Sequence, residues 1–359
     1  MAAGCFRIKA SRAHQGFGNR PSARLYSLRR RQGASNLNLR IIQIIVALAG
    51  TFFFLALALY HVPKHAIGAS LASADPIWIG AAMFAYAVNL ALRAWRWQMI
   101  LRPVAAVPYP IVARVLLVGY GSNTIMPARL GELFRAEFCK TSFGVSRVWA
   151  LTSIVVERLF DGLTVVACLG AGLLLAARTR QPPGLLIDVL AVGGTLFGAI
   201  LVVALCLGGP RISRLFAGFP RLSDQLIAVR RGLAILRTRR TMQVAILTLV
   251  IYLPDALSLW CIVRAVGLGL GLADTLVLVG AASLSTLLPS GPAFLGTLQF
   301  AYVLAIEFAG AQGAVGIAAA TLSQFCLLLP VAVVATAVLV HGSGNLLRTA
   351  LTRRELKLT

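Results

Sequence analysis

The sequence is poor in charged residues, and above all in acidic ones. Of its 359 residues, 13% are charged, 11 are Asp or Glu, and 58% are hydrophobic. The mean hydropathy is +0.84. Such a composition leaves too few polar side chains to cover a soluble globular protein. We therefore predict an all-α polytopic membrane protein.

Signatures of several enzyme and metal-binding classes are also missing. The sequence has no Gly-x-Ser-x-Gly motif and no phosphate-binding Gly-x-x-x-x-Gly-Lys-Ser/Thr motif. The six cysteines stand singly, so they indicate neither a zinc site nor a disulfide framework. His61 and His65 have helical spacing, but Pro63 lies between them and no carboxylate is near. We expect no metal, no cofactor and no catalytic residue of these classes.

The basic residues gather at the ends of apolar segments, which indicates membrane topology and not nucleic-acid binding. Residues 1–40 carry nine basic side chains and no acidic one, so we expect a basic N-terminal segment in the cytoplasm. Arg93, Arg96 and Arg102 mark the cytoplasmic end of the second span, and Trp95-Arg96-Trp97 is typical of an interfacial anchor with Arg96 in the aqueous layer. Six full spans are predicted, at 41–60, 77–101, 148–177, 185–208, 243–265 and 315–340.

The remaining parts of the chain fit this topology. The basic loop 209–241 and the basic tail 346–359 are expected in the cytoplasm, and 41–345 forms the membrane domain. We expect this domain in a bacterial cytoplasmic (inner) membrane.

Two apolar stretches, 111–141 and 274–311, are interrupted by Pro, Gly and polar residues. The first contains Ser122-Asn-Thr-Ile-Met-Pro127 and Leu130-Gly-Glu-Leu-Phe134, and the second contains Leu284-Ser-Thr-Leu-Leu-Pro289 and Leu295-Gly-Thr-Leu-Gln-Phe300. By the parity of the spans they enter from opposite faces. We predict two re-entrant hairpins that form an inverted repeat with a site between them. A pair of ordinary Pro-kinked helices is the alternative.

Charged residues lie deep within one predicted span. Glu157 is roughly 14 Å along the helix that begins near Val148, which is close to the middle of a bilayer core. Glu157 and Asp161 share a helix face, and Arg158 is placed to pair with Asp161. Glu157 then needs a partner from elsewhere, for which Arg129 or Arg135 is the candidate. The cluster either contacts a ligand or forms an ion network that only holds the hairpin.

These residues also carry a family resemblance. The motifs are Asn123-x-x-x-Pro127-x-Arg129-x-Gly131-Glu132-x-x-Arg135, then Glu157-Arg158-x-x-Asp161, then Leu288-Pro-x-Gly-Pro-x-x-x-Gly296. They resemble the lysylphosphatidylglycerol synthase transmembrane-region family over roughly residues 41–345. The resemblance implies a lipid flippase built from inverted repeats, as in bifunctional members that move aminoacylated phosphatidylglycerol. Those members continue into a soluble aminoacyl-transferase domain, so for this chain we expect no synthase activity and a lipid of the charged, glycolipid or hopanoid type.

The sequence therefore predicts a flippase or transporter for an amphiphile with a charged headgroup. Arg129 and Arg135 would bind phosphate, the carboxylates would orient them or bind an amine, and the hairpins would form two gates. The candidate substrate-binding residues are Asn123, Pro127, Arg129, Gly131, Glu132, Arg135, Glu157, Arg158, Asp161, Asp255, Pro289, Gly291, Gly296, Gln299 and Glu307. The expected partners are membrane lipids, including anionic headgroups at the basic loops, and lipid-synthesis enzymes.

Two alternatives remain open. One is a membrane-embedded lipid transferase with Glu157 or Asp161 as general base. The other is a non-transporting accessory subunit of a lipid-synthesis pathway that docks through loop 209–241.

Overall fold

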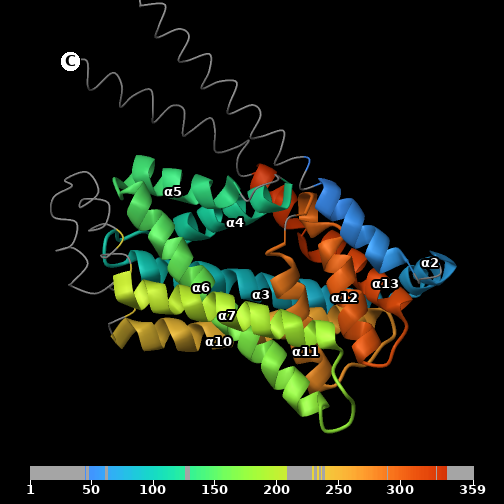
Figure 1. The fold of residues 1–359 in the computed structure, drawn as a ribbon. Helices are drawn as coiled ribbons and strands as arrows, with labels where there is room; N and C mark the ends of the chain where they lie inside the picture. The colour runs from blue at the N-terminus through green and yellow to red at the C-terminus, as the bar shows by residue number, and fades with distance from the viewer. Residues whose placement is uncertain are drawn as a thin grey trace, which may run out of the picture. The chain divides into compact units, whose positions relative to one another are not determined.

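The fold is seen in a computed structural model that describes residues 48–60, 64–125, 130–207, 239–288, 290–328 and 330–337, with a few isolated positions besides. The predictions for segments 1–40 and 346–359, for most of loop 209–241, and for Pro127, Arg129 and Pro289 lie outside the described residues. Within the described ranges every regular element is a helix, so the all-α prediction is confirmed (Figure 1).

A short apolar helix, Leu48–Leu59, precedes the labelled elements. The α-helices are α2 (Lys64–Ala72), α3 (Pro76–Leu101), α4 (Tyr109–Ile125), α5 (Leu130–Phe143), α6 (Arg147–Ala176), α7 (Gly184–Leu207), α10 (Arg239–Ala265), α11 (Leu272–Ser285), α12 (Thr297–Phe308) and α13 (Gly313–Ser323). A 3-10 turn, η3 (Pro292–Phe294), stands between α11 and α12, and a π-helical turn, η4 (Gln324–Leu328), extends α13.

Five of these segments are long and apolar enough to cross a membrane: α3, α6, α7, α10 and the continuous stretch Gly313–Ala337. They correspond to five of the six predicted spans. The sixth, 41–60, is described as a helix only over Leu48–Leu59, which is shorter than the roughly 20 residues that a span needs. The described chain thus contains five candidate spans.

Local capping explains where two of the spans begin. Asp75 caps α3, because its Oδ1 accepts a hydrogen bond from the Ile77 amide at 2.8 Å, and Pro76 occupies the first turn. Ser146 caps α6 in the same way, with its Oγ accepting from the Trp149 amide at 3.2 Å. The start of α6 is therefore fixed by a short polar side chain.

Each interrupted stretch contains two helices that follow one another in the chain. We call α4 and α5 the first hairpin, and α11, η3 and α12 the second hairpin. In the first, the helices run so close that a Cβ on Gly131 would lie 1.9 Å from the carbonyl oxygen of Gly119. The Gly131 amide donates to Asn123 Oδ1 at 2.8 Å. Because α4 also contacts η3, the two hairpins meet.

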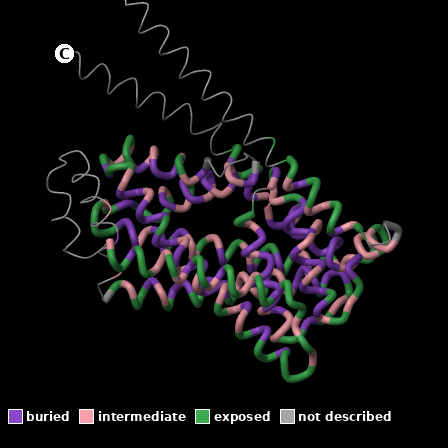
Figure 2. The backbone as a smooth tube through the Cα atoms, viewed as in Figure 1, coloured by how far each residue is buried: buried purple, intermediate pink, exposed green. Residues whose placement is uncertain are grey.

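Helix α6 connects two apolar cores. Its first half, with Trp149 and Leu159, packs among α3, α4 and α5, whereas its second half, with Leu169 and Leu173, packs among α10, α11 and α12. Buried residues concentrate where these helices meet (Figure 2). Glu157 and Asp161 lie on α6 at the junction of the two cores.

Candidate functional site

The centre of the junction is a buried ion network around Arg96 of α3. Its guanidinium is bidentate on Asp161, with Nη1 2.6 Å from Oδ1 and Nη2 3.0 Å from Oδ2. Nη2 also donates to Glu157 Oε1 at 3.1 Å, and Nη1 donates to Thr248 Oγ1 of α10 at 3.0 Å. Because Arg96 is fully buried, these bonds compensate its removal from water.

The first hairpin joins this network through Arg135 of α5. Its Nη2 lies 2.7 Å from Glu157 Oε2, and its guanidinium carbon lies 4.0 Å from the centre of the buried Trp97 ring. The prediction that Glu157 takes a partner from the hairpin is thus confirmed for Arg135. Arg135 and Glu157 are both buried behind the cavity described below, so Arg135 binds a carboxylate and an aromatic face.

The predicted pairing of Arg158 with Asp161 is wrong. Arg158 bonds to Glu132 of the first hairpin, with Nε and Nη2 each 3.0 Å from Oε1. Asp161 is bound by α3, since Arg93 Nη1 lies 3.2 Å from its Oδ2 beside the bidentate Arg96. An arginine on a neighbouring helix can approach the carboxylate head-on, and α3 supplies two.

The interfacial-anchor prediction for Trp95-Arg96-Trp97 is also wrong. Only Trp95 is exposed, whereas Arg96 and Trp97 are fully buried. The reason is that α3 packs along α10 and turns one polar face into the protein. On that face Asn89 accepts from Arg93 Nε at 2.8 Å and donates to the Ile251 carbonyl at 3.0 Å.

A signal for this missed face is present in the sequence. Asn89, Arg93 and Arg96 have the spacing i, i+4, i+7, which places them on one side of a helix. On α10, Thr248, Tyr252 and Asp255 have the same spacing. Two polar stripes of equal period inside two apolar spans indicate that the spans face each other.

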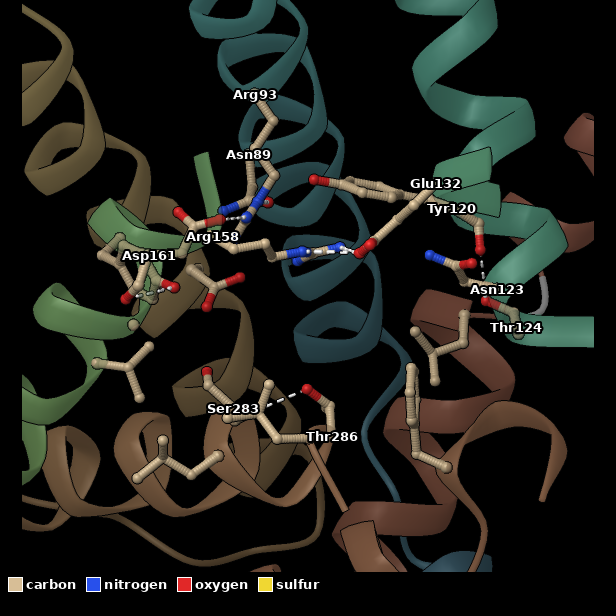
Figure 3. A pocket seen from close by; sticks show the side chains of 18 of the residues that line it. Asn89, Arg93, Tyr120, Asn123, Thr124, Glu132, Arg158, Asp161, Ser283 and Thr286 are labelled. Carbon is tan, nitrogen blue, oxygen red and sulfur yellow. Dashed lines mark hydrogen bonds and ion pairs between the residues drawn. The ribbon is translucent and has the colours of Figure 1, made fainter. Parts of the chain in front are cut away.

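A cavity of about 550 Å³ opens next to the network, and both hairpins line it (Figure 3). The charged lining residues are Arg93, Glu132, Arg158, Asp161 and Asp255. The uncharged polar ones are Tyr86, Asn89, Tyr120, Asn123, Thr124, Tyr252, Ser283 and Thr286. Figure 3 shows the Arg158 side chain reaching toward Glu132, with Ser283 and Thr286 on another side of the cavity.

Three of these charged side chains can still bind a ligand. The side chains of Arg158 and Glu132 are 35% and 27% exposed, so their pair faces the cavity and is only partly desolvated. Asp255 lines the cavity, and within the described part of the chain no ion pair or hydrogen bond to its carboxylate is found. The four arginines of the network and cavity are balanced by Glu132, Glu157, Asp161 and Asp255, so a ligand that carries both signs fits this surface.

Five of the predicted site residues therefore come together at the cavity, namely Asn123, Glu132, Arg158, Asp161 and Asp255. Gly131 packs the first hairpin. Glu307 is exposed at the end of α12 and is not a lining residue.

The predicted residues of the second hairpin hold its break. The Gly291 amide donates to Thr51 Oγ1 at 2.6 Å, and Gly296 has φ +87° with Thr51 backbone where a Cβ would stand. Gln299 Oε1 accepts from the Gly296 amide at 2.8 Å and its Nε2 donates to Gln324 Oε1 at 2.7 Å. These residues shape the backbone beside the cavity and do not line it.

No group of three or more His, Cys, Asp or Glu side chains that could hold a metal occurs among the described residues. The lining side chains of the cavity offer guanidinium, carboxylate, phenol and amide groups for ionic and hydrogen-bonding recognition.

Comparisons with known proteins relate the chain to a curated protein and to a family of membrane regions. A segment of 141 residues is 29% identical to the protein named glycosyltransferase AglD of Haloferax volcanii, which covers 39% of this chain and 23% of that protein. The model of the family described as "Lysylphosphatidylglycerol synthase TM region" matches residues 41–335. The chain therefore belongs to the lysylphosphatidylglycerol synthase TM-region family.

Proposed function

We propose that the protein is a lipid flippase or transporter that binds a charged headgroup in the cavity between its two hairpins. The observation that carries this proposal is a cavity lined by both hairpins, with charged side chains at the level of a buried ion network. Ionisable residues inside a membrane protein commonly mark a substrate path, because their burial is otherwise costly. Membership of the family supports a lipid as the substrate.

In this proposal, Arg158 and Arg93 face a phosphate group of the lipid. Guanidinium groups bind phosphate oxygens through two parallel hydrogen bonds, and Arg158 is the more exposed of the two. Asp255 and Glu132 would bind an amine or hydroxyl groups of the same headgroup. Arg135 and Arg96 act behind them, by holding Glu157 and Asp161 in place.

The two hairpins would serve as gates in an inverted repeat. The contact of α4 with η3 and the shared cavity support this arrangement. A cysteine pair placed at Ala128 and Ser290 should cross-link with a short or medium reagent, because in the sequence each position lies between the two helices of its hairpin. If this pair and the neighbouring pairs all failed to cross-link in folded protein, the two stretches would instead be ordinary kinked helix pairs.

We further propose a bacterial inner membrane with both termini and loop 209–241 in the cytoplasm, where their basic side chains contact anionic lipids. A cysteine at Ser213 should then resist labelling from outside intact cells. Labelling of that position would reject this topology.

The similarity to a protein named glycosyltransferase favours a second candidate, a membrane-embedded transferase acting on a lipid-linked substrate. Asp161 or Glu157 would be its general base. Both carboxylates are held by two arginines, which disfavours proton uptake and makes this the weaker candidate.

The test is reconstitution of the full chain in liposomes with a fluorescent phosphatidylglycerol and with lipids extracted from the source membrane. Under the proposal, lipid moves between leaflets without covalent change, and Arg158→Gln and Glu132→Gln each slow it strongly. The matched control is Arg147→Gln, which removes an exposed ion pair with Glu137 away from the cavity. A modified lipid in the mass spectrum would instead establish the transferase, and equal rates in all variants would reject the site.

A further inference from the structure

Resting on the proposed function, we propose that the cavity opens sideways into the bilayer between α7 and the second hairpin. The acyl chains of the bound lipid would leave it beside Leu196 and Leu287 and lie along the outer face of α7. We call this opening the α7 portal. It assigns a binding surface for lipid tails in addition to the site for the headgroup.

The size of the cavity requires such a route. About 550 Å³ lies within the range of roughly 300–1,000 Å³ that is typical of pockets for drug-sized molecules. A polar headgroup fits in that volume, whereas a headgroup together with two long acyl chains does not. The chains must therefore pass through a wall of the cavity.

The wall formed by α7 is apolar and begins next to the charged lining residues of the cavity. Its three lining residues are Leu196, Phe197 and Ile200. The Phe197 ring packs directly over Gly162 of α6, since a Cβ there would lie 2.0 Å from Phe197 Cε1. Gly162 follows Asp161, so the cavity changes from ionic to apolar within one residue of α6.

A close contact between α7 and the second hairpin lies one helical turn before the proposed portal. Gly193 of α7 faces Leu284 of α11, with 3.5 Å between an ideal Cβ and Leu284 Cδ1. Three residues farther along each segment stand Leu196 and Leu287, which both line the cavity. They are 48% and 41% exposed. The rim of the opening is therefore made of two leucines, a surface suited to an acyl chain.

Leu196 also belongs to the outer stripe of α7. At about 100° per residue, Val192 and Val203 lie within about 40° of it around the helix. Both are exposed, at 68% and 54%. Because α7 is a candidate span with only 17% of its apolar window buried, this stripe faces the hydrocarbon of the membrane. The same side chain thus borders the cavity and the lipid.

The test uses the full chain and two matched substitutions on α7. Leu196→Trp fills the portal, whereas Val202→Trp places the same indole side chain at an exposed site about 120° away around the helix. The probes are phosphatidylglycerol, with its acyl chains, and glycerophosphoglycerol, which is its headgroup alone. Retained phosphatidylglycerol is counted by native mass spectrometry, and headgroup affinity is measured by calorimetry.

If the portal holds the tails, Leu196→Trp lowers retention of phosphatidylglycerol by about tenfold, corresponding to about 1.4 kcal/mol, and leaves glycerophosphoglycerol affinity unchanged. Leu287→Trp should act in the same direction, and Val202→Trp should match the wild type. Equal retention by Leu196→Trp and Val202→Trp would overturn the portal. Retention that depends on Leu196 without any lipid movement by the wild type would keep the portal and reject the flippase function.

Discussion

The two hairpins have the same outline but are held by different chemistry. The first is fastened to α6 by ion pairs, Arg135 with Glu157 and Glu132 with Arg158. The second is fastened by neutral groups, with Thr51 bound to the Gly291 amide and Gln324 bound to Gln299 and to the Ala293 carbonyl. Of the two hairpins, the first therefore contributes charged side chains to the site, and the second contributes a turn of unusual backbone conformation.

That irregularity is concentrated at the break of the second hairpin. Ala293 and Phe294 have φ values of 55° and 57°, a region that residues with a Cβ seldom occupy, and Gly296 follows at 87°. Such a conformation persists only where surrounding groups over-determine it, which Thr51, Gln299 and Gln324 do. Phe294 lines the cavity, so this strained turn forms part of the site. Two hairpins beside one cavity can thus be held by ion pairs in one case and by neutral hydrogen bonds in the other.

The largest effect is expected from removing the ionic anchor of the first hairpin. Arg135→Met leaves the buried Glu157 with Arg96 and a long hydrogen bond from Tyr120, and loss of one partner from a buried pair costs about 3–5 kcal/mol. We expect a large drop in the melting temperature of the purified protein and loss of transport. Arg147→Met, in an exposed pair, is the control and should melt like the wild type. If both variants melted like the wild type, the network would contribute nothing to holding the hairpin.

The next effect comes from the close backbone approach within the first hairpin. Gly131→Ala places a methyl group against the Gly119 carbonyl, and overpacking of this kind costs about 1–3 kcal/mol. Gly198→Ala is the control, because no atom lies within 4 Å of its Cβ position. Thermal unfolding in detergent should separate the two variants. Equal stability would mean that α4 and α5 are farther apart than the structure shows.

The sequence predicts the ion pairs of the first hairpin better than the neutral hydrogen bonds of the second. The motif Glu157-Arg158-x-x-Asp161 predicts a buried cluster in which Glu157 needs a partner, either Arg129 or Arg135, and the structure describes the pair with Arg135. Arg93 and Arg96 were assigned to the membrane interface, because a basic residue near the end of a span satisfies the positive-inside rule as well as an interior residue does. The packing of α3 on α10 decides between them, and the sequence points to that packing only through the matched polar stripes of the two spans.

The partners within the second hairpin were beyond prediction for a related reason. Gly291, Gly296 and Gln299 are recognisable as motif residues, but Thr51 is 240 residues distant from Gly291 in the chain. A hydroxyl group in an apolar helix normally bonds to its own backbone. Nothing in the local sequence distinguishes such a hydroxyl group from one that bonds to a distant helix break.

A smaller effect is expected from the neutral anchor of the second hairpin. Thr51→Val keeps the shape of the side chain but leaves the buried Gly291 amide without its acceptor, which costs about 1–3 kcal/mol. Thr51→Ser retains the hydroxyl group and is the matched control. We expect Thr51→Val to unfold at a lower temperature than Thr51→Ser and to exchange the Gly291 amide hydrogen faster. Equal exchange in both would remove Thr51 from the set of groups that hold this turn.

The smallest effect on stability is expected at the cavity itself, from Glu132→Gln and Arg158→Gln. Their side chains are partly exposed, and an ion pair in contact with water contributes about 0–1 kcal/mol, so both variants should melt close to the wild type. Ligand binding, unlike stability, should differ between the two variants. Arg158 has the most exposed guanidinium among the ion pairs of the cavity and network, and it is freed when Glu132 loses its charge. Glu132→Gln is therefore expected to bind glycerophosphoglycerol at least as tightly as the wild type, and Arg158→Gln more weakly. Calorimetry on the two variants measures whether each substitution strengthens or weakens this binding. Tighter binding by Arg158→Gln would mean that a cation other than Arg158 binds the headgroup phosphate.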